Sequence, residues 1–209
     1  MQKSKQPVVV QGNASFPEIK KEEIIQQSDT IVIAQVKSQN SFKAPSEIRE
    51  NNEDVITNVT LSIEKYLRNY NNNSFQEIIV QTLGGTVENL TMNFEGTPTF
   101  KDGERVIVFL KKKNNNVFTV YGWAQGKYSI SSDGEVGMGE QELSYFQNVF
   151  GSNLTLAEIE NQIDLFKNIP PKNDISNLDY SLENQNGNVN DKNSEANSVL
   201  EKSIQIEVE

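Results

Sequence analysis

The feature that most constrains the fold is a series of short β-branched runs separated by turns rich in Gly, Asn and Asp. Residues 30–36 are so dense in Ile and Val that they predict a strand buried on both faces. Residues 55–64 alternate apolar with polar side chains, which is typical of a strand with one face in water. Further strands are predicted, in chain order, at 77–83, 90–94, 105–110, 117–124 and 126–130. Short strands at this spacing favour a barrel or a sandwich, so the fold class is predicted to be mainly β.

Helical patterns flank the strands on both sides. Residues 15–18 have capping-box spacing, and a short helix is predicted from there through residue 27. After residue 139 the apolar side chains fall at helical spacing, and a second capping box at 155–158 opens another helix. The Pro-Pro pair at 170–171 ends this helical region.

These patterns divide the chain into four parts: an extended leader (1–14), a β domain (15–138), C-terminal helices packed on it (139–170) and a disordered acidic tail (171–209). The tail is predicted to be disordered because it consists of Asn, Ser, Asp and Glu with few apolar residues. Its last residues, 199–209, alternate weakly, which is compatible with a strand added to a partner.

The composition excludes several classes of function. With 29 acidic and 19 basic residues, the chain has a formal net charge of -10, which repels nucleic acid phosphates. Its basic cluster at 111–113 stands beside three Asn residues and is predicted to be a hairpin tip. The chain has no Cys and no His, so it cannot build a Ser-His-Asp or Cys-His nucleophile or an ordinary zinc site. We expect no nucleic acid partner, no membrane insertion, no metal site and no cofactor.

Catalytic motifs are matched only by their letters. Ser62 and Lys65 have the spacing of a Ser-x-x-Lys dyad, but residues three apart on a strand point to opposite faces. Paired carboxylates are the one catalytic chemistry that this composition allows, and nothing in the sequence places two acids across a cleft. We therefore expect that the protein is not an enzyme.

The most suggestive cluster for binding is the segment 118–128, which is rich in aromatic residues. If this segment is a strand, Tyr121, Trp123 and Gln125 share one face, and small residues line the other. Two aromatic rings and an amide suit a stacking or peptide-binding surface. The predicted binding residues are Tyr121, Trp123, Gln125 and Tyr128. The alternative is that the C-terminal helices pack over Tyr121 and Trp123 and bury them.

Several short motifs occur in a fixed order between residues 17 and 136: Ser-Asp-Thr-Ile-Val at 28–32, Thr57-x-Val59, Gly84-Gly85, Phe100-x-x-Gly103-Glu104, Phe109-Leu110 and Gly-Trp-Ala-Gln-Gly-Lys-Tyr at 122–128. This succession resembles an uncharacterised family of exported bacterial and archaeal proteins. The resemblance implies a small OB-like antiparallel barrel, closed or partly open, and an exported location, but no reaction. At fold level alone, the architecture also looks like the netrin-type domains of metalloproteinase inhibitors, which rely on an N-terminal Cys and disulfides that this chain lacks.

The expected function is a non-catalytic binding module, extracellular or on the cell surface, that acts as a monomer on a protein or glycan partner. Sequons accord with export after removal of a signal peptide, although an Asn-rich chain also produces them by chance: Asn13, Asn58, Asn72, Asn89 and Asn153. Two alternatives stay open. One is a secreted protease inhibitor acting by loop insertion, and the other is a carboxylate-dependent enzyme acting on glycans.

Overall fold

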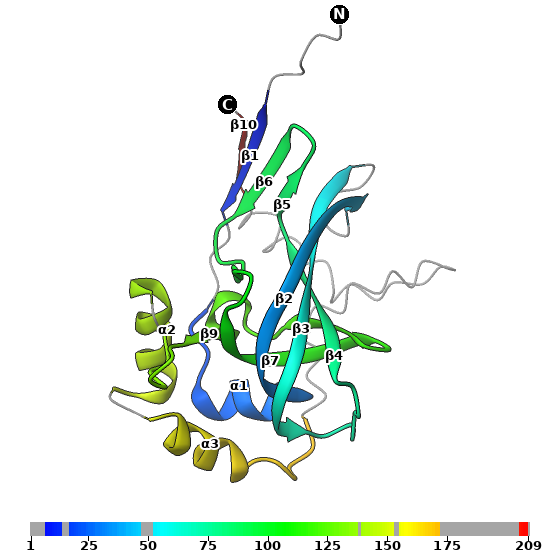
Figure 1. The fold of residues 1–209 in the computed structure, drawn as a ribbon. Helices are drawn as coiled ribbons and strands as arrows, with labels where there is room; N and C mark the ends of the chain where they lie inside the picture. The colour runs from blue at the N-terminus through cyan, green and yellow to red at the C-terminus, as the bar shows by residue number, and fades with distance from the viewer. Residues whose placement is uncertain are drawn as a thin grey trace, which may run out of the picture.

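A closed ring of five strands forms the centre of the molecule (Figure 1). The structure is a computed structural model that describes residues 7–13, 17–46, 52–137, 139–152, 155–171 and 205–208. The five strands of the ring are β2 (Thr30–Pro45), β3 (Glu53–Asn69), β4 (Glu77–Leu83), β7 (Arg105–Asn114) and β8 (Val117–Val120).

The pairings show how the ring closes. β2 pairs with β3, β3 with β4, and β7 with β8, all antiparallel, while β4 and β8 are parallel. The ladder between β2 and β7, from Thr30 opposite Leu110 to Gln35 opposite Arg105, completes the circle. This strand order, with one parallel pair, is that of an OB-like barrel, and the predicted fold class is confirmed.

The first half of β2 separates two hydrophobic cores. Val32, Ala34 and Val36 point into the barrel, whereas Ile31 and Ile33 point outward, and all five side chains are buried. The prediction of a strand buried on both faces is therefore confirmed. The barrel interior is filled by the inward side chains of all five strands and by Phe100: Val32, Ala34, Val36, Val59, Leu61, Ile78, Val80, Phe100, Val106, Val108, Leu110 and Phe118.

Three helices cover the outer side of β2 and β7: α1 (Lys21–Gln27), α2 (Glu140–Phe150) and α3 (Leu156–Asp164). A short strand, β9 (Lys127–Ile130), pairs with β7 beneath them. Their apolar faces meet in an aromatic cluster in which the ring of Tyr128 stands edge-on to Phe109, Phe146 and Phe150, with centroids 5.4–6.2 Å apart. Edge-to-face packing of this kind stabilises a core beyond the apolar area that it buries.

The two predicted capping boxes have different outcomes. Thr155 accepts a hydrogen bond from the backbone N–H of Glu158, whose carboxylate accepts one from the backbone N–H of Thr155, as predicted for the start of α3. The helix predicted from 15–18 instead begins at Lys21, after an N-cap, Lys20, that makes no side-chain capping bond. The prediction placed this start too early, because residues 17–20 precede the helix.

Beyond the barrel, β2 and β3 continue as a long hairpin beside a second sheet (Figure 1). The sheet contains β1 (Val8–Asn13), β6 (Leu90–Phe94) and β5 (Gly85–Val87), and β10 (Gln205–Val208) is added at the edge of β1. The loop predicted at 38–52 is wrong, because Ser38–Pro45 pairs with Glu53–Thr60. Residues 38–45 carry mostly polar side chains, so no apolar period signals a strand there, whereas the paired residues of β3 from Val55 onward were predicted as a strand.

The predicted leader also contributes to this sheet. β1 pairs in parallel with β6, and the backbone N–H of Glu95 donates to the carbonyl of Gly12 over 2.8 Å. A Cβ atom at Gly12 would lie 2.4 Å from a ring carbon of Phe94, so only glycine fits between the ring and the strand. The rest of the leader and most of the predicted tail lie outside the described residues.

We expect Gly12→Ala to loosen β1 without affecting the barrel. The methyl group must displace the ring of Phe94, and overpacking of this kind costs about 1–3 kcal/mol. Amide hydrogen exchange should speed up in Val8–Asn13 and Leu90–Phe94 and stay unchanged in β2 and β7. Gly139→Ala is the matched control, because a Cβ atom there meets nothing within 4 Å. Equal exchange rates in the two variants would contradict the packing described for Phe94.

Candidate binding surface

The segment predicted to carry the site is not a continuous strand. β8 ends at Val120, and the chain then turns into a short 3-10 helix, η1 (Trp123–Gly126), before β9 begins. Gly122 and Trp123 have φ angles of 78° and 55°, in the left-handed region where a strand cannot continue. The predicted alternation of faces along 118–128 is therefore wrong, because this turn breaks the period of two.

Two of the four predicted binding residues point into the protein. Tyr128 is completely buried, and its hydroxyl donates to the carbonyl of Gln125. Burial, and to a smaller degree the charge of Glu142, raises the pKa of the Tyr128 phenol far above its ordinary value. The side-chain amide of Gln125 accepts from the N–H of Ile19 and donates to the carbonyl of Pro17, both over 3.0 Å. Gln125 thus holds the segment before α1 against η1, and neither residue faces solvent.

The other two predicted residues lie at the surface. Trp123 is half-buried in η1, and Tyr121 is half-buried between α1 and β7. The hydroxyl of Tyr121 donates to the carboxylate of Glu23 over 3.3 Å, and the ammonium group of Lys111 lies 5.9 Å from its ring centroid. Tyr121 is therefore part of a chain of polar contacts that continues towards the turns of the barrel.

Asp29, directly before β2, contacts both Lys111 and Lys112 of β7. Its carboxylate lies 3.5 Å from the ammonium nitrogen of Lys111 and accepts from the backbone N–H of Lys112 over 3.0 Å. These residues and those of the neighbouring turn between β3 and β4 form one surface, which we call the polar belt. It consists of Glu23, Asp29, Tyr70, Asn73, Phe75, Lys111, Lys112 and Tyr121. The belt runs from α1 across the end of β7 to the turn between β3 and β4.

The turn between β3 and β4 places an ammonium group between an amide and an aromatic ring. Lys112 donates to the side-chain oxygen of Asn73 over 3.0 Å, and its nitrogen lies 5.7 Å from the ring centroid of Phe75. Two reciprocal bonds of 2.8 Å between Asn69 and Asn73 fix the turn, and Tyr66 donates to the carbonyl of Phe75. Within the described part of the chain, no carboxylate pairs with the ammonium group of Lys112.

Arg68 ties this end of the barrel to the helices. Its buried guanidinium group donates to the backbone carbonyls of Ser28, Gln26, Phe166 and Ile169. Burial lowers the pKa of Arg68, and the nearby charge of Asp29 acts in the opposite direction. The guanidinium carbon also lies 5.7 Å from the ring centroid of Tyr70, which is 42% exposed. Tyr70 is thus a large aromatic side chain on the surface, and its ring lies next to the buried guanidinium group of Arg68.

The contact between the turn at 69–73 and the hairpin tip at 111–116 was not predicted from the sequence. The basic cluster at 111–113 was predicted as a hairpin tip, and the turn at 69–73 is one of the Asn-rich turns expected between the strands. Their contact depends on the parallel pairing of β4 with β8, which brings Asn73 and Lys112 together across 39 residues of chain. A crossing of this kind leaves no pattern in the sequence. The one local signal was the unusual density of Asn side chains in both turns, with three Lys residues beside them in the second turn.

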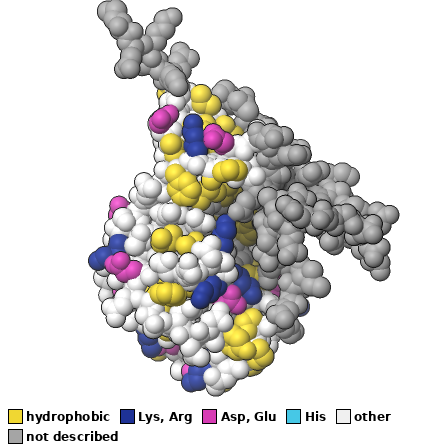
Figure 2. Space-filling view, turned by 90° about the vertical axis from the view of Figure 1, so that its right-hand side faces the viewer, with side chains coloured by type: hydrophobic (Ala, Val, Ile, Leu, Met, Phe, Trp, Pro, Cys, Tyr) yellow, Lys and Arg dark blue, Asp and Glu magenta, His cyan; other side chains and the backbone are white. Residues whose placement is uncertain are grey.

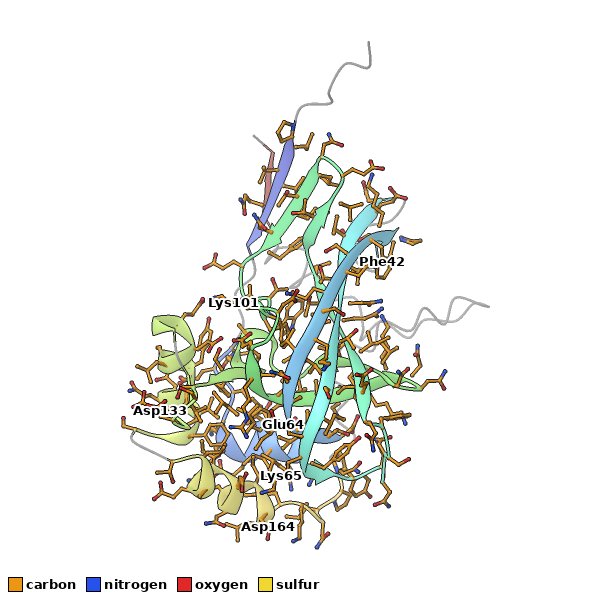
Figure 3. All side chains as sticks on the ribbon, in the orientation of Figure 1. Phe42, Glu64, Lys65, Lys101, Asp133 and Asp164 are labelled. Carbon is orange, nitrogen blue, oxygen red and sulfur yellow. The ribbon has the colours of Figure 1, made fainter. Side chains whose placement is uncertain are left out.

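The surface around the hairpin tip mixes the two signs of charge. Figure 2 shows basic and acidic side chains interspersed on the face that lies to the right in Figure 1. Figure 3 shows Glu64 and Lys65 next to each other on the lower half of β3, and each forms an ion pair with a different element. Glu64 accepts from Arg105 over 2.8 Å, whereas Lys65 binds Glu160 of α3 over 2.7 Å. Lys65 therefore holds α3 against β3 and makes its charge-assisted bond with a helix, not with Ser62.

Two carboxylates do come together on the other side of the barrel. Glu104 and Glu142 accept from the ammonium group of Lys127 over 2.6 and 2.7 Å, and the side chain of Lys127 is 4% exposed. Ser129 donates its hydroxyl to Glu104 and its backbone N–H to Glu142. Burial raises the pKa of Glu142, but the bonds from Lys127 and Ser129 together outweigh it and hold that pKa below its ordinary value. An acid catalyst needs a raised pKa, whereas the pKa of Glu142 is lowered. Through Lys127, the two carboxylates form an ionic link between α2 and the barrel.

No known protein family and no curated protein matches the chain. Among the described residues, no three His, Cys, Asp or Glu side chains are grouped as ligands of a metal ion. None of the described helices is long and apolar enough to cross a bilayer.

We expect Arg68→Lys to release the end of α3. A Lys side chain offers one point charge and cannot reach four carbonyls at once, so buried carbonyls lose their donors. The free energy of unfolding should fall by about 2–4 kcal/mol. Limited proteolysis should cut within 164–171 faster than it does in the native chain. Arg105→Lys is the matched control, since its bond to Glu64 is exposed and should change the free energy by less than about 0.5 kcal/mol. A similar loss in both variants would contradict the role of Arg68.

The ionic link predicts acid sensitivity. The pKa of Glu142 is depressed in the folded protein, so its stabilisation is present above the ordinary pKa of a carboxyl and is lost as the pH falls through the folded value. Glu142→Gln should lower the free energy of unfolding by about 1–3 kcal/mol at pH 7. It should also reduce the further loss between pH 5 and pH 3. Urea denaturation measures both. The exposed Glu88→Gln is the control, and an identical pH dependence in the two variants would refute the prediction.

Proposed function

We propose that the protein is a non-catalytic binding module of the extracellular or cell-surface space, and that the polar belt contacts its protein or glycan partner. The observation that carries this proposal is the arrangement of Tyr70, Phe75 and Lys112 on fixed turns at one end of the barrel. An exposed aromatic ring next to a cation and several amides is a typical composition for a binding hot spot. Its parts are held in place before any partner arrives, so little ordering entropy is lost on binding.

The fold supports the same location. OB-like barrels often bind oligosaccharides or oligonucleotides through loops that border one face, and the turn between β7 and β8 is one of those loops. The net charge of -10 disfavours the nucleic acid. A glycan or a protein surface remains, and exposed aromatic side chains such as Tyr70 suit a surface of either kind.

The two other functions considered from the sequence have weaker support. A protease inhibitor acting by loop insertion would use an exposed turn, and the tip of the hairpin between β2 and β3 lies outside the described residues. A carboxylate-dependent enzyme would use a pair of acids such as Glu104 and Glu142, whose position around Lys127 suits an ionic link better than catalysis.

We expect the double variant Tyr70→Ala and Lys112→Ala to bind at least about tenfold more weakly than the native chain, which corresponds to about 1.4 kcal/mol. Binding of the fluorescently labelled full chain would be measured on an array of neutral and acidic oligosaccharides and on intact cells of the source organism. Unfolding free energy should change little, because Tyr70 and Lys112 are exposed.

Lys101→Ala is the matched control for charge. Lys101 is exposed and lies well away from the belt, in the loop before β7 (Figure 3). Its loss should leave binding unchanged. If the double variant binds as strongly as the native chain, the belt is not the binding surface. If Lys101→Ala weakens binding equally, the effect is one of overall charge.

A further inference from the structure

The backbone of β1 presents a second possible interaction surface, independent of the polar belt. The N–H of Val8 donates to the carbonyl of Asn89, and the carbonyl of Gly12 accepts from Glu95, both over 2.8 Å. Backbone groups of a strand alternate in direction, so Val8, Val10 and Gly12 face β6. The N–H and C=O groups of the intervening residues, Val9, Gln11 and Asn13, therefore face the opposite edge.

This opposite edge accepts an antiparallel strand. Residues of β10 pair with β1 in the register Gln11 with Glu207 and Asn13 with Gln205. β1 is added to β6 from the N-terminal side of the barrel, and β10 is added to β1 from beyond α3, so both strands come from parts of the chain far outside 85–94. The edge of this sheet is thus a place where distant segments are added through backbone bonds.

The connection to β10 is long enough for β10 to reach the β1 edge of a neighbouring molecule. Residues 172–204 separate the described part of the C-terminal region from β10. A chain of this length spans at most about 110 Å when fully extended, several times the width of a small domain. The same strand can therefore reach the β1 edge of its own molecule or of another one.

We propose that the outer edge of β1 is a strand-addition site at which one copy of the protein receives the C-terminal strand of a second copy. Exposed sheet edges are templates for pairing with another chain, and recognition by strand addition depends mainly on backbone groups. The site itself is suitable, because β1 carries exposed apolar side chains. Val8 and Val9 are 39% and 38% exposed.

Within one molecule, β10 competes for its own edge, so the exchange is best tested with two complementary variants. Gln11→Pro removes an N–H from the outer edge and keeps the groups that face β6, a position that tolerates proline in an edge strand. Glu207→Pro removes the matching N–H from the C-terminal strand. The first variant has an intact strand without an edge to receive it, and the second has a free edge without a strand.

The measurement is an NMR titration at high protein concentration, because a four-residue pairing is expected to have a Kd of about 1 mM or weaker. Isotope-labelled Glu207→Pro is titrated with unlabelled Gln11→Pro. Saturable shifts are expected at the amides of Val9, Gln11 and Asn13, and they should grow with salt, because each copy carries a net charge of -10. Gln11→Thr keeps the N–H, so labelled chains with Gln11→Thr and Glu207→Pro should show the same shifts.

Three results would overturn the proposal. The first is the absence of any shift in β1. The second is an equal shift when the unlabelled chain carries both Gln11→Pro and Glu207→Pro, since that chain has no strand to donate. The third is a shift confined to belt residues such as Tyr70, which would place self-association at the polar belt. If Gln11→Pro loses the protection of Val10 and Gly12 against hydrogen exchange, Asn13→Pro replaces it. Loss of partner binding in the belt variant leaves this titration unaffected, so the two proposals fail separately.

Discussion

The rest of the structure depends on the double pairing of Thr30–Gln35. These six residues form one ladder with β3 and another with β7, and the second ladder closes the barrel. Their side chains alternate between the barrel interior and the layer beneath the helices, so a single strand is the wall shared by both cores. A polar residue at any of positions 31–34, whose side chains are all buried, would leave an unsatisfied group in one core or the other.

The sequence predicts those parts of the fold in which side chains report the environment directly. The buried run of β2 and the strands at 77–83 and 90–94 carry β-branched or alternating side chains and form as predicted. The extended half of β2, residues 38–45, does not, because it consists mostly of polar side chains that are exposed or half-buried. A turn that depends on one φ angle, such as that of Gly122 and Trp123, is equally invisible in a pattern of apolar residues.

The candidate site shows the same division. The aromatic and amide side chains of 121–128 predicted a binding surface, but composition does not determine which way a side chain points. Gln125 and Tyr128 point inward and hold other segments in place. Tyr121 alone among the four residues joins the polar belt. The rest of the belt comes from turns that are ordinary in sequence and become a surface only through the closure of the barrel. Long-range strand pairing sets this closure, and single-sequence patterns contain little information about it.

The clamp made by Arg68 has a mechanical consequence. The chain leaves the described helical region at Pro171, two residues beyond Ile169, whose carbonyl Arg68 holds. A pull applied to the chain from its C-terminal side therefore loads the guanidinium group before it loads the packing of α3. Arg68 belongs to β3, which is paired along its length with β2 and over Ile56–Ser62 with β4, so the force passes into the barrel as shear along the strands. Many backbone bonds then share the load at once, and a tethered molecule of this shape would keep its barrel folded while its outer helices are under tension.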